Sequence, residues 1–286
     1  MSDRQLDLEV LAEGFVFLEG PRWHGERLWF SDMWGHTIHA MTAAGVCETV
    51  ASVPTRPSGL NFLPDGRLVV VSMADRKLLE VTSQGELEDY ADLSQLAAAD
   101  INDSVVDASG NIYVGNFGYD LFNNAEPALA NLVKVAPDGD MSVVATDVNF
   151  PNGAVITPDG DTFIVAETFA HCLTAFDRAA DGSLSRRRVW AELGERTPDG
   201  ICLDEAGAIW VASFMTDEFI RVEEGGRITH VIPCAGRRAV ACNLGGSDGR
   251  TLFALTYEGA IEDIASGGRN ARIETCRVEV PGSGSP

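Results

Sequence analysis

The chain lacks paired cysteines and long apolar runs, and both absences exclude classes of protein. Its 286 residues include six cysteines, which are scattered along the sequence with no CxxC pair. This usage is typical of buried reduced thiols rather than of a disulfide framework or a zinc site. No apolar run approaches the ~20 residues of a membrane-spanning helix, and the amino terminus lacks the cationic start and apolar stretch of a secretory signal. We therefore expect a cytoplasmic protein without structural disulfides.

Positive charge is scarce as well. The sequence has 21 Lys and Arg residues against 43 Asp and Glu residues, a formal net charge of −22 at pH 7. A surface this acidic repels phosphate backbones and anionic lipid, so we expect neither a nucleic acid nor a membrane partner. Hydrophobic residues make up 45% of the chain, which is ample for a sizeable core.

The most informative feature that is present is an internal repeat of a hairpin pattern. Each copy has a short apolar run, a turn containing glycine, and a second run rich in Val, Ile, Trp, Phe and Tyr. The six copies occupy residues 20–32, 59–72, 103–116, 153–168, 200–213 and 244–256. Their turns follow one another at intervals of roughly 40 to 50 residues, the length of a four-stranded propeller blade.

The repeat predicts an all-β fold, a single six-bladed β-propeller domain over residues 1–286 with four antiparallel strands in each blade. A parallel α/β fold is disfavoured because no long amphipathic stretch separates the strands. The ring of blades must close to protect its edge strands, so we expect terminal strands from 8–16 and 271–280 to share the last blade. Residues 92–100 are expected to form a short turn of helix. Such a fold is self-contained, and we expect a monomer or a homodimer.

One polar residue recurs just before the first strand-like run of every repeat. A repeated sequence position is a repeated structural position, so these side chains should form a ring around the propeller axis. The expected ring comprises Glu19, Ser58, Asn102, Asn152, Asp199 and Asn243. Its ligand atoms are all oxygens, which hard cations such as calcium, magnesium or manganese require. A cation would also offset the repulsion between the two carboxylates.

The text around these positions falls into four motifs: LEGPRW around Glu19, IND at 101–103, FPNGAVITPDG at 150–160 and TPDGICLDEAGAIWVA at 197–212. In these motifs the chain resembles the gluconolactonase, regucalcin (senescence marker protein) and luciferin-regenerating enzyme family over nearly its whole length. The resemblance implies a six-bladed propeller with one divalent metal in its channel, calcium first, with manganese, magnesium or zinc as alternatives. It also implies that Glu19, Asn152 and Asp199 bind the metal and that Asn102 contacts substrate or metal-bound water.

One position departs from the family. The resemblance implies an arginine two residues before that asparagine in sugar-lactone hydrolases, where it holds sugar hydroxyls, but this chain has Asp100. A carboxylate cannot donate those hydrogen bonds, so we expect a substrate other than a simple sugar lactone. The loop 119–131 is either a lid or an inert surface excursion. Five aromatic residues at second-strand ends either wall a substrate pocket or pack between blades: Trp34, Phe117, Phe169, Phe214 and Tyr257.

The chemistry suggested is hydrolysis of a lactone or ester substrate, with a lactone opening to the hydroxy acid. The metal would polarise the ring carbonyl, and a carboxylate would accept the proton of the attacking water. We assign Asp199 as the base and Asn102 as the residue that orients substrate or water. Glu167 and Asp103 are second choices for the base.

Three other functions remain open. A calcium-dependent phosphotriesterase would use the same ring, and only substrate assays separate it from a lactonase. A calcium-binding or ligand-binding propeller would keep the metal without catalysis. A metal-free propeller resembling the strictosidine synthase group is disfavoured because Glu19, Asn152 and Asp199 occur together.

Overall fold

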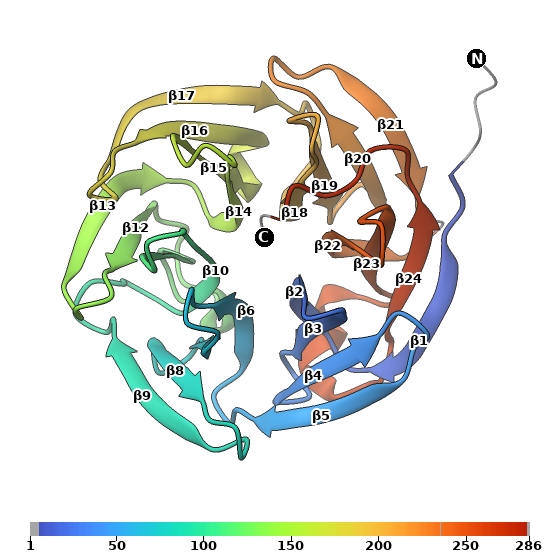
Figure 1. Ribbon diagram of the computed structural model, residues 1–286, viewed down its shortest axis with the longest axis horizontal. Coiled ribbons are helices and arrows are strands. Elements are labelled where there is room, and N and C mark those ends of the chain that lie inside the picture. The colour runs from blue at the N-terminus through green and yellow to red at the C-terminus, as the bar shows by residue number, and fades with distance from the viewer. Residues whose placement is uncertain (1–5, 235, 285–286) are drawn as a thin grey trace.

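Four-stranded antiparallel sheets recur six times around a central axis in the structure, a computed structural model that describes residues 6–234 and 236–284 (Figure 1). This arrangement confirms the predicted six-bladed β-propeller. Blades 1 to 3 consist of β2 (Leu18–His24), β3 (Arg27–Asp32), β4 (Thr37–Thr42) and β5 (Cys47–Ser52); β6 (Pro57–Phe62), β7 (Leu68–Ser72), β8 (Lys77–Val81) and β9 (Leu87–Asp92); and β10 (Ile101–Val106), β11 (Ile112–Asn116), β12 (Ala130–Val135) and β13 (Met141–Val148).

The second half of the chain repeats the same sheet order. Blades 4 to 6 consist of β14 (Pro151–Ile156), β15 (Thr162–Glu167), β16 (Cys172–Arg178) and β17 (Leu184–Glu192); β18 (Pro198–Leu203), β19 (Ile209–Ser213), β20 (Glu218–Val222) and β21 (Ile228–Pro233); and β22 (Arg238–Gly245), β23 (Thr251–Tyr257), β24 (Ala271–Arg277) and β1 (Glu9–Phe15). In the part of the chain that the structure describes, three short 3-10 elements lie in the loops: η1 (Leu121–Asn123), η2 (Thr168–Ala170) and η3 (Ile261–Ser266). Within the described residues, no helix is both long and apolar enough to cross a membrane.

The two ends of the chain close the ring of blades, as the sequence predicted. Strand β1 pairs antiparallel with β24, with Glu9 opposite Thr275 and Phe15 opposite Ala271. The amino-terminal strand is therefore the outer strand of blade 6, and β22 is its innermost strand. Pairing the ends in one sheet joins the first and last parts of the chain and leaves each blade packed between two neighbours.

Segment 92–100 forms a single hydrogen-bonded turn, in keeping with the expected short turn of helix, and does not extend into a helix. The backbone N–H of Ala97 donates to the carbonyl of Leu93 at 2.8 Å, and the chain then continues into β10. Both side chains are buried in the core beneath the turn. So short a connection forms too few backbone hydrogen bonds to offset the unfavourable free energy of helix nucleation.

Burial falls from the axis outward. All six residues of the inner strands β14 and β18 are buried, whereas most residues of the outer strands β5 and β17 are exposed. Close packing of the inner strands depends on glycine. A Cβ on Gly153 would lie 2.6 Å from the Ile201 nitrogen in the next blade. The inner strands can therefore approach closely enough to place their first side chains around one axis.

Candidate functional site

Five polar side chains occupy the same place in five successive inner strands. Each is the second residue of its strand, and we call them the ring: Glu19, Ser58, Asn102, Asn152 and Asp199. In every one of these strands the register with the second strand shifts just after this point. Such a bulge re-aims a side chain away from the ladder. The ring predicted from the repeat is confirmed as a structural feature in these five blades.

The sixth predicted member, Asn243, is not at this position. Gly153 approaches the backbone of Asp199–Ile201, and Gly200 approaches Val240 and Ala241 in the same way, so Val240 is the counterpart of Asp199 in blade 6. Asn243 lies three residues further along β22, where it pairs with Phe253 and accepts a hydrogen bond from the Trp23 N–H at 3.0 Å. The prediction was wrong because β22 is longer than the other inner strands, so counting back from its turn misplaces the register.

Hydrogen bonds link the ring side chains from blade to blade. Ser58 Oγ donates to Asn102 Oδ1 at 3.3 Å, and Asn102 Nδ2 donates to Asn152 Oδ1 at 3.1 Å. Asn152 Nδ2 lies 3.4 Å from Thr168 Oγ1, and the Asn152 side chain also hydrogen-bonds to Asp199. Asn102 and Asn152 are thereby oriented before any ligand arrives.

The two ring carboxylates are electrostatically unfavourable as they stand. Burial raises the pKa of Asp199 well above its ordinary value, and the nearby Asp103 adds to the rise. Burial likewise raises the pKa of Glu19, with further contributions from Asp199 and Asp103. Among the described residues, Asp199 Oδ1 is buried with no hydrogen-bond donor. Buried acceptors normally have a partner, so a divalent cation with oxygen ligands fits the residues present.

A buried arginine that the sequence analysis did not single out lies beside the ring. Arg22 Nη2 donates to Asp103 Oδ1 at 2.8 Å and to the Ser104 carbonyl at 2.6 Å. The guanidinium lowers the pKa of Glu19 against the larger effects that raise it. Arg22 stands three residues after Glu19 in the LEGPRW motif. Considering the positions that follow each ring residue in its inner strand would have identified it from the sequence. Asp103, a second choice for the base, is therefore close to the ring but held by Arg22.

Glu167, the other second choice, is bound elsewhere. Its carboxylate accepts hydrogen bonds from the Asn149 N–H at 2.7 Å, from Thr174 Oγ1 at 2.5 Å and from Arg187 Nη2 at 2.6 Å. These donors come from the loop before β14 and from β16 and β17. These donors occupy both carboxylate oxygens, which disfavours Glu167 as the base.

The predicted aromatic residues are connected to one another by three further phenylalanines that the sequence analysis did not identify: Phe17, Phe122 and Phe150. Phe117 stacks on Phe150 at 4.5 Å between ring centroids, and Phe169 packs on Phe150 at 4.8 Å. Trp34 and Phe117 both contact Phe122, at 5.5 and 5.9 Å. Phe214 and Tyr257 contact Phe17, at 6.4 and 5.5 Å. Phe17 and Phe150 each lie two residues before a ring residue, so the same repeat would have found them.

We call these preceding positions the rim: Phe17, Arg56, Asp100, Phe150, Thr197 and, in blade 6, Arg238. Asp100 is not an isolated carboxylate there, because Arg56 Nη2 donates to its Oδ2 at 2.5 Å. The Asp100 carboxylate cannot donate a hydrogen bond, as the sequence analysis stated. The guanidinium of Arg56, from the neighbouring blade, supplies a hydrogen-bond donor at the same place. Asp100 therefore no longer excludes a hydroxylated lactone.

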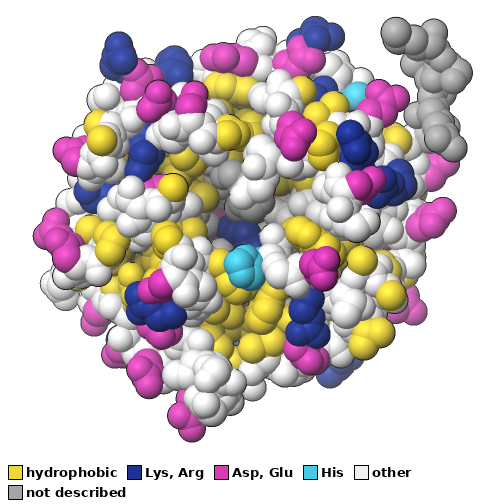
Figure 2. All heavy atoms as spheres, in the orientation of Figure 1, with side chains coloured by type: hydrophobic (Ala, Val, Ile, Leu, Met, Phe, Trp, Pro, Cys, Tyr) yellow, Lys and Arg dark blue, Asp and Glu magenta, His cyan; other side chains and the backbone are white. Residues whose placement is uncertain are grey.

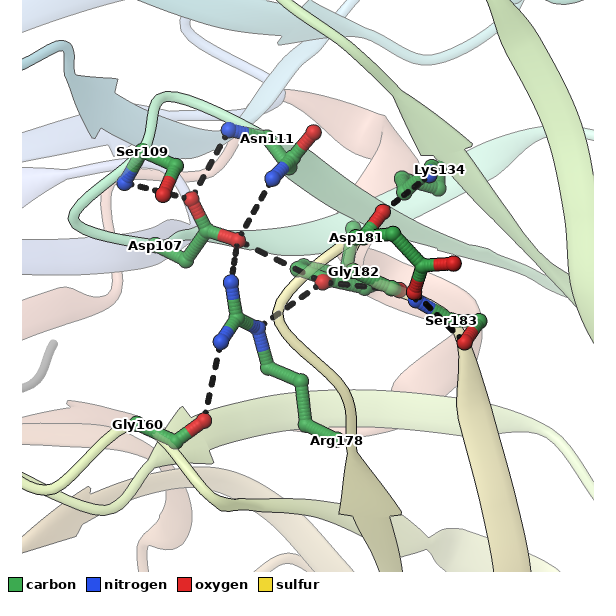
Figure 3. A network of polar contacts seen from close by, with 10 residues as sticks. Asp107, Ser109, Asn111, Lys134, Gly160, Arg178, Asp181, Gly182 and Ser183 are labelled. Atoms are coloured by element: carbon green, nitrogen blue, oxygen red, sulfur yellow. Dashed lines mark hydrogen bonds and ion pairs between the residues drawn. The ribbon is translucent and has the colours of Figure 1, made fainter.

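The opposite end of the channel is built differently. A cavity of about 710 Å³ opens there, lined by the far ends of the first four inner strands and by residues 283–284. Figure 2 shows this end as a hollow at the centre of the face, with basic and histidine side chains beside it. In its lining, Asp107 accepts hydrogen bonds from the backbone of Ser109 and Asn111 and pairs with Arg178 (Figure 3).

Comparison with known proteins assigns the family. A family model described as the SMP-30/Gluconolactonase/LRE-like region matches residues 17–258. Pentonolactonase XacC of Haloferax volcanii is 26% identical over 281 residues, which cover 94% of this chain and 92% of that protein.

Two solved structures show the same fold. A luciferin-regenerating enzyme aligns with a TM-score of 0.83 at 19% identity, covering 97% of both chains. A calcium-binding protein, regucalcin from Agrobacterium tumefaciens, aligns with a TM-score of 0.81 at 23% identity, covering 97% of this chain and 96% of that one. With the family match extending over all five ring residues, the chain belongs to the SMP-30/gluconolactonase/LRE-like family.

Proposed function

We propose that this protein is a divalent-metal-dependent lactone hydrolase, with calcium as the first candidate metal. The observation that carries the proposal is Asp199 Oδ1, buried beside Glu19 and Asp103 and, in the described part of the chain, without a hydrogen-bond donor. A full-length relative named pentonolactonase supports the reaction class, and a structural relative named as a calcium-binding protein is consistent with the metal.

Glu19, Asn152 and Asp199 would hold the cation. They supply two carboxylates and one amide oxygen, a donor set suited to a hard cation. When bound, the cation supplies Lewis-acid polarisation of the carbonyl and stabilisation of negative charge. It also offsets the two causes that raise the pKa of both carboxyl groups in the protein alone, burial first and repulsion between carboxylates second.

The protein's own residues would then position the reactants and move the proton. Asn102, fixed between Ser58 and Asn152, orients the lactone or the water by hydrogen bonding. Water attacks the carbonyl carbon while Asp199 accepts its proton. The ring C–O bond then breaks, and the proton passes to the departing alkoxide, which leaves the open hydroxy acid.

The test is a panel of sugar, aliphatic and aromatic lactones, assayed after EDTA treatment and again with calcium, manganese or magnesium restored. We expect ring opening only with metal, together with a metal-induced rise in melting temperature. Glu19→Gln and Asn152→Ala should abolish both responses. Ser58→Ala, a ring residue outside the proposed ligand set, is the matched control and should keep the thermal response. Hydrolysis that persists in EDTA, or a panel without any hydrolysis, contradicts the proposal.

A further inference from the structure

Arg56 and Asp100 form an ion pair at the rim, just outside the ring. Each stands two residues before a ring residue, Arg56 before Ser58 and Asp100 before Asn102. Arg56 Nη2 donates to Asp100 Oδ2 at 2.5 Å, while Ser58 Oγ donates to Asn102 Oδ1 at 3.3 Å. The same two neighbouring blades thus carry two stacked polar pairs. A ligand that reaches Asn102 from the rim passes the ion pair first.

The guanidinium of Arg56 has hydrogen-bonding capacity to spare. Within residues 6–234 and 236–284, its Nη1 is buried with no acceptor. The group lies against two neighbouring rings, 5.0 Å from the centroid of Trp34 and 4.3 Å from that of Phe122. A buried charged donor without an acceptor costs free energy, and contact with aromatic faces offsets only part of that cost. The arrangement suits a donor that is completed by a ligand.

Phe122 covers this donor from the 119–131 loop. Its side chain is 41% exposed, and it lies on η1 in the 119–131 loop, which has no buried residues in that turn. For the described part of the chain, the hydrogen bonds made by η1 and its caps stay local, such as that from the Asn123 N–H to Asp120. Displacing the Phe122 ring therefore breaks its contacts with Trp34, Phe117 and Arg56 but, within the described residues, no hydrogen bond to the blades.

The charges near the rim favour a neutral ligand over a carboxylate. Arg56 is paired with Asp100, Arg22 with Asp103, and Arg238 with Asp217. Each positive charge already has a negative partner, so an added carboxylate gains little. The Arg56–Asp100 pair instead offers a donor at Nη1 and an acceptor on a carboxylate that is 24% exposed. A hydroxyl group, which both accepts and donates, matches that combination.

We propose that Arg56 and Asp100 form a specificity-determining pair that binds a ring hydroxyl of the substrate. Arg56 Nη1 donates to the hydroxyl oxygen, and the hydroxyl proton is donated to Asp100. Once the Phe122 ring has moved off the guanidinium, Trp34 packs against the carbon face of the same ring. The proposal rests on the lactone hydrolase function and names the feature of the lactone that this protein recognises.

The test compares two five-membered lactones, one with hydroxyl groups on ring carbons 2 and 3 and one unsubstituted. Arg56→Gln should lower kcat/KM for the hydroxylated lactone by about tenfold to 100-fold, mainly through KM, and leave the unsubstituted lactone nearly unchanged. Asp100→Asn should act in the same direction, and Arg56→Lys should restore part of the loss. Arg238→Gln, the matched rim arginine of blade 6, should leave the ratio of the two substrates unchanged.

A binding measurement separates this proposal from the proposed function. Calorimetry with the dihydroxylated five-membered lactam, which resists hydrolysis, should show at least tenfold tighter binding than with the unsubstituted lactam, and Arg56→Gln should remove the difference. Lactam binding without any lactone hydrolysis would contradict the hydrolase proposal but support the pair. An equal loss on both lactones in Arg56→Gln, or an equal effect of Arg238→Gln, overturns the pair as a reader of hydroxyl groups.

Discussion

The two ends of the propeller channel treat buried carboxylates in opposite ways. At the ring end, burial raises the pKa of Asp199 well above its ordinary value. At the other end, burial alone would raise the pKa of Asp107, but hydrogen bonds from Asn111 and Arg178 outweigh it and hold the pKa below its ordinary value. The difference lies in the partners, since both carboxylates sit on inner strands of one fold or directly after them.

The network around Asp107 shows what full satisfaction requires. Asp107 accepts from two backbone N–H groups and the Asn111 amide, while Arg178 also donates to the Gly160 carbonyl and to Tyr113 (Figure 3). This network joins blade 3 to blade 4 and contributes to stability. At the ring end Asp199 has only the Asn152 amide as a hydrogen-bond donor, and within the described residues its Oδ1 has none, which is the arrangement expected of a site that awaits a ligand.

The largest expected effect is on turnover. Asp199→Asn should reduce kcat/KM by about 10³-fold or more, because the amide cannot accept a proton as a base. The melting temperature of the EDTA-treated protein should not fall, since the amide oxygen can still accept the hydrogen bond from Asn152. Steady-state assays and calorimetry on the same preparations check both statements. Wild-type rates would show that Asp199 is not the base. A large loss of stability would show that Asp199, like Asp107, stabilises the fold, so the two ends of the channel would not differ in this respect.

The next effect is on stability at the other end. Arg178→Met leaves the carboxylate of Asp107 buried without its charge partner, and breaking such a pair costs about 3–5 kcal/mol. Urea denaturation should show this loss, while kcat on the best lactone stays near wild type. The control is Arg277→Met, whose ion pair with Asp248 is exposed to solvent; its loss should destabilise the protein far less than Arg178→Met does. A fall in kcat for folded Arg178→Met would show that the two ends are coupled.

The smallest effect concerns pH. Because the folded-state pKa of Asp107 is lowered, its ionised form stabilises the protein above the unfolded-state pKa of about 3.9, and this contribution is lost as the pH falls through the folded-state pKa. The difference in unfolding free energy between wild type and Asp107→Asn should therefore shrink as the pH falls below 4. Ser109→Ala, in the same turn, should give a curve parallel to wild type. A difference that does not change with pH contradicts the assignment.

Local sequence patterns predicted the parts of the site that repeat. The turn glycines Gly66, Gly110 and Gly160 all adopt the positive φ that the hairpin pattern requires. Ring positions followed from the same repeat, and they fail only at Asn243, where β22 is longer than its counterparts. Glu167 was misjudged because its donors, Thr174 and Arg187, come from strands whose pairing register the sequence does not reveal.

The sequence by itself determined the blade count, the closure by both termini and the all-oxygen composition of the ring, because each depends on a repeat period or on residue type. Only the tertiary structure decided which arginine meets which carboxylate. Arg22 lies 81 positions from Asp103, Arg178 lies 71 from Asp107, and Arg56 lies 44 from Asp100. These pairs cross between blades, so they exist only once the blades have packed around a common axis. A guanidinium's partner depends on that packing and on the bulges of the inner strands, which no local pattern encodes.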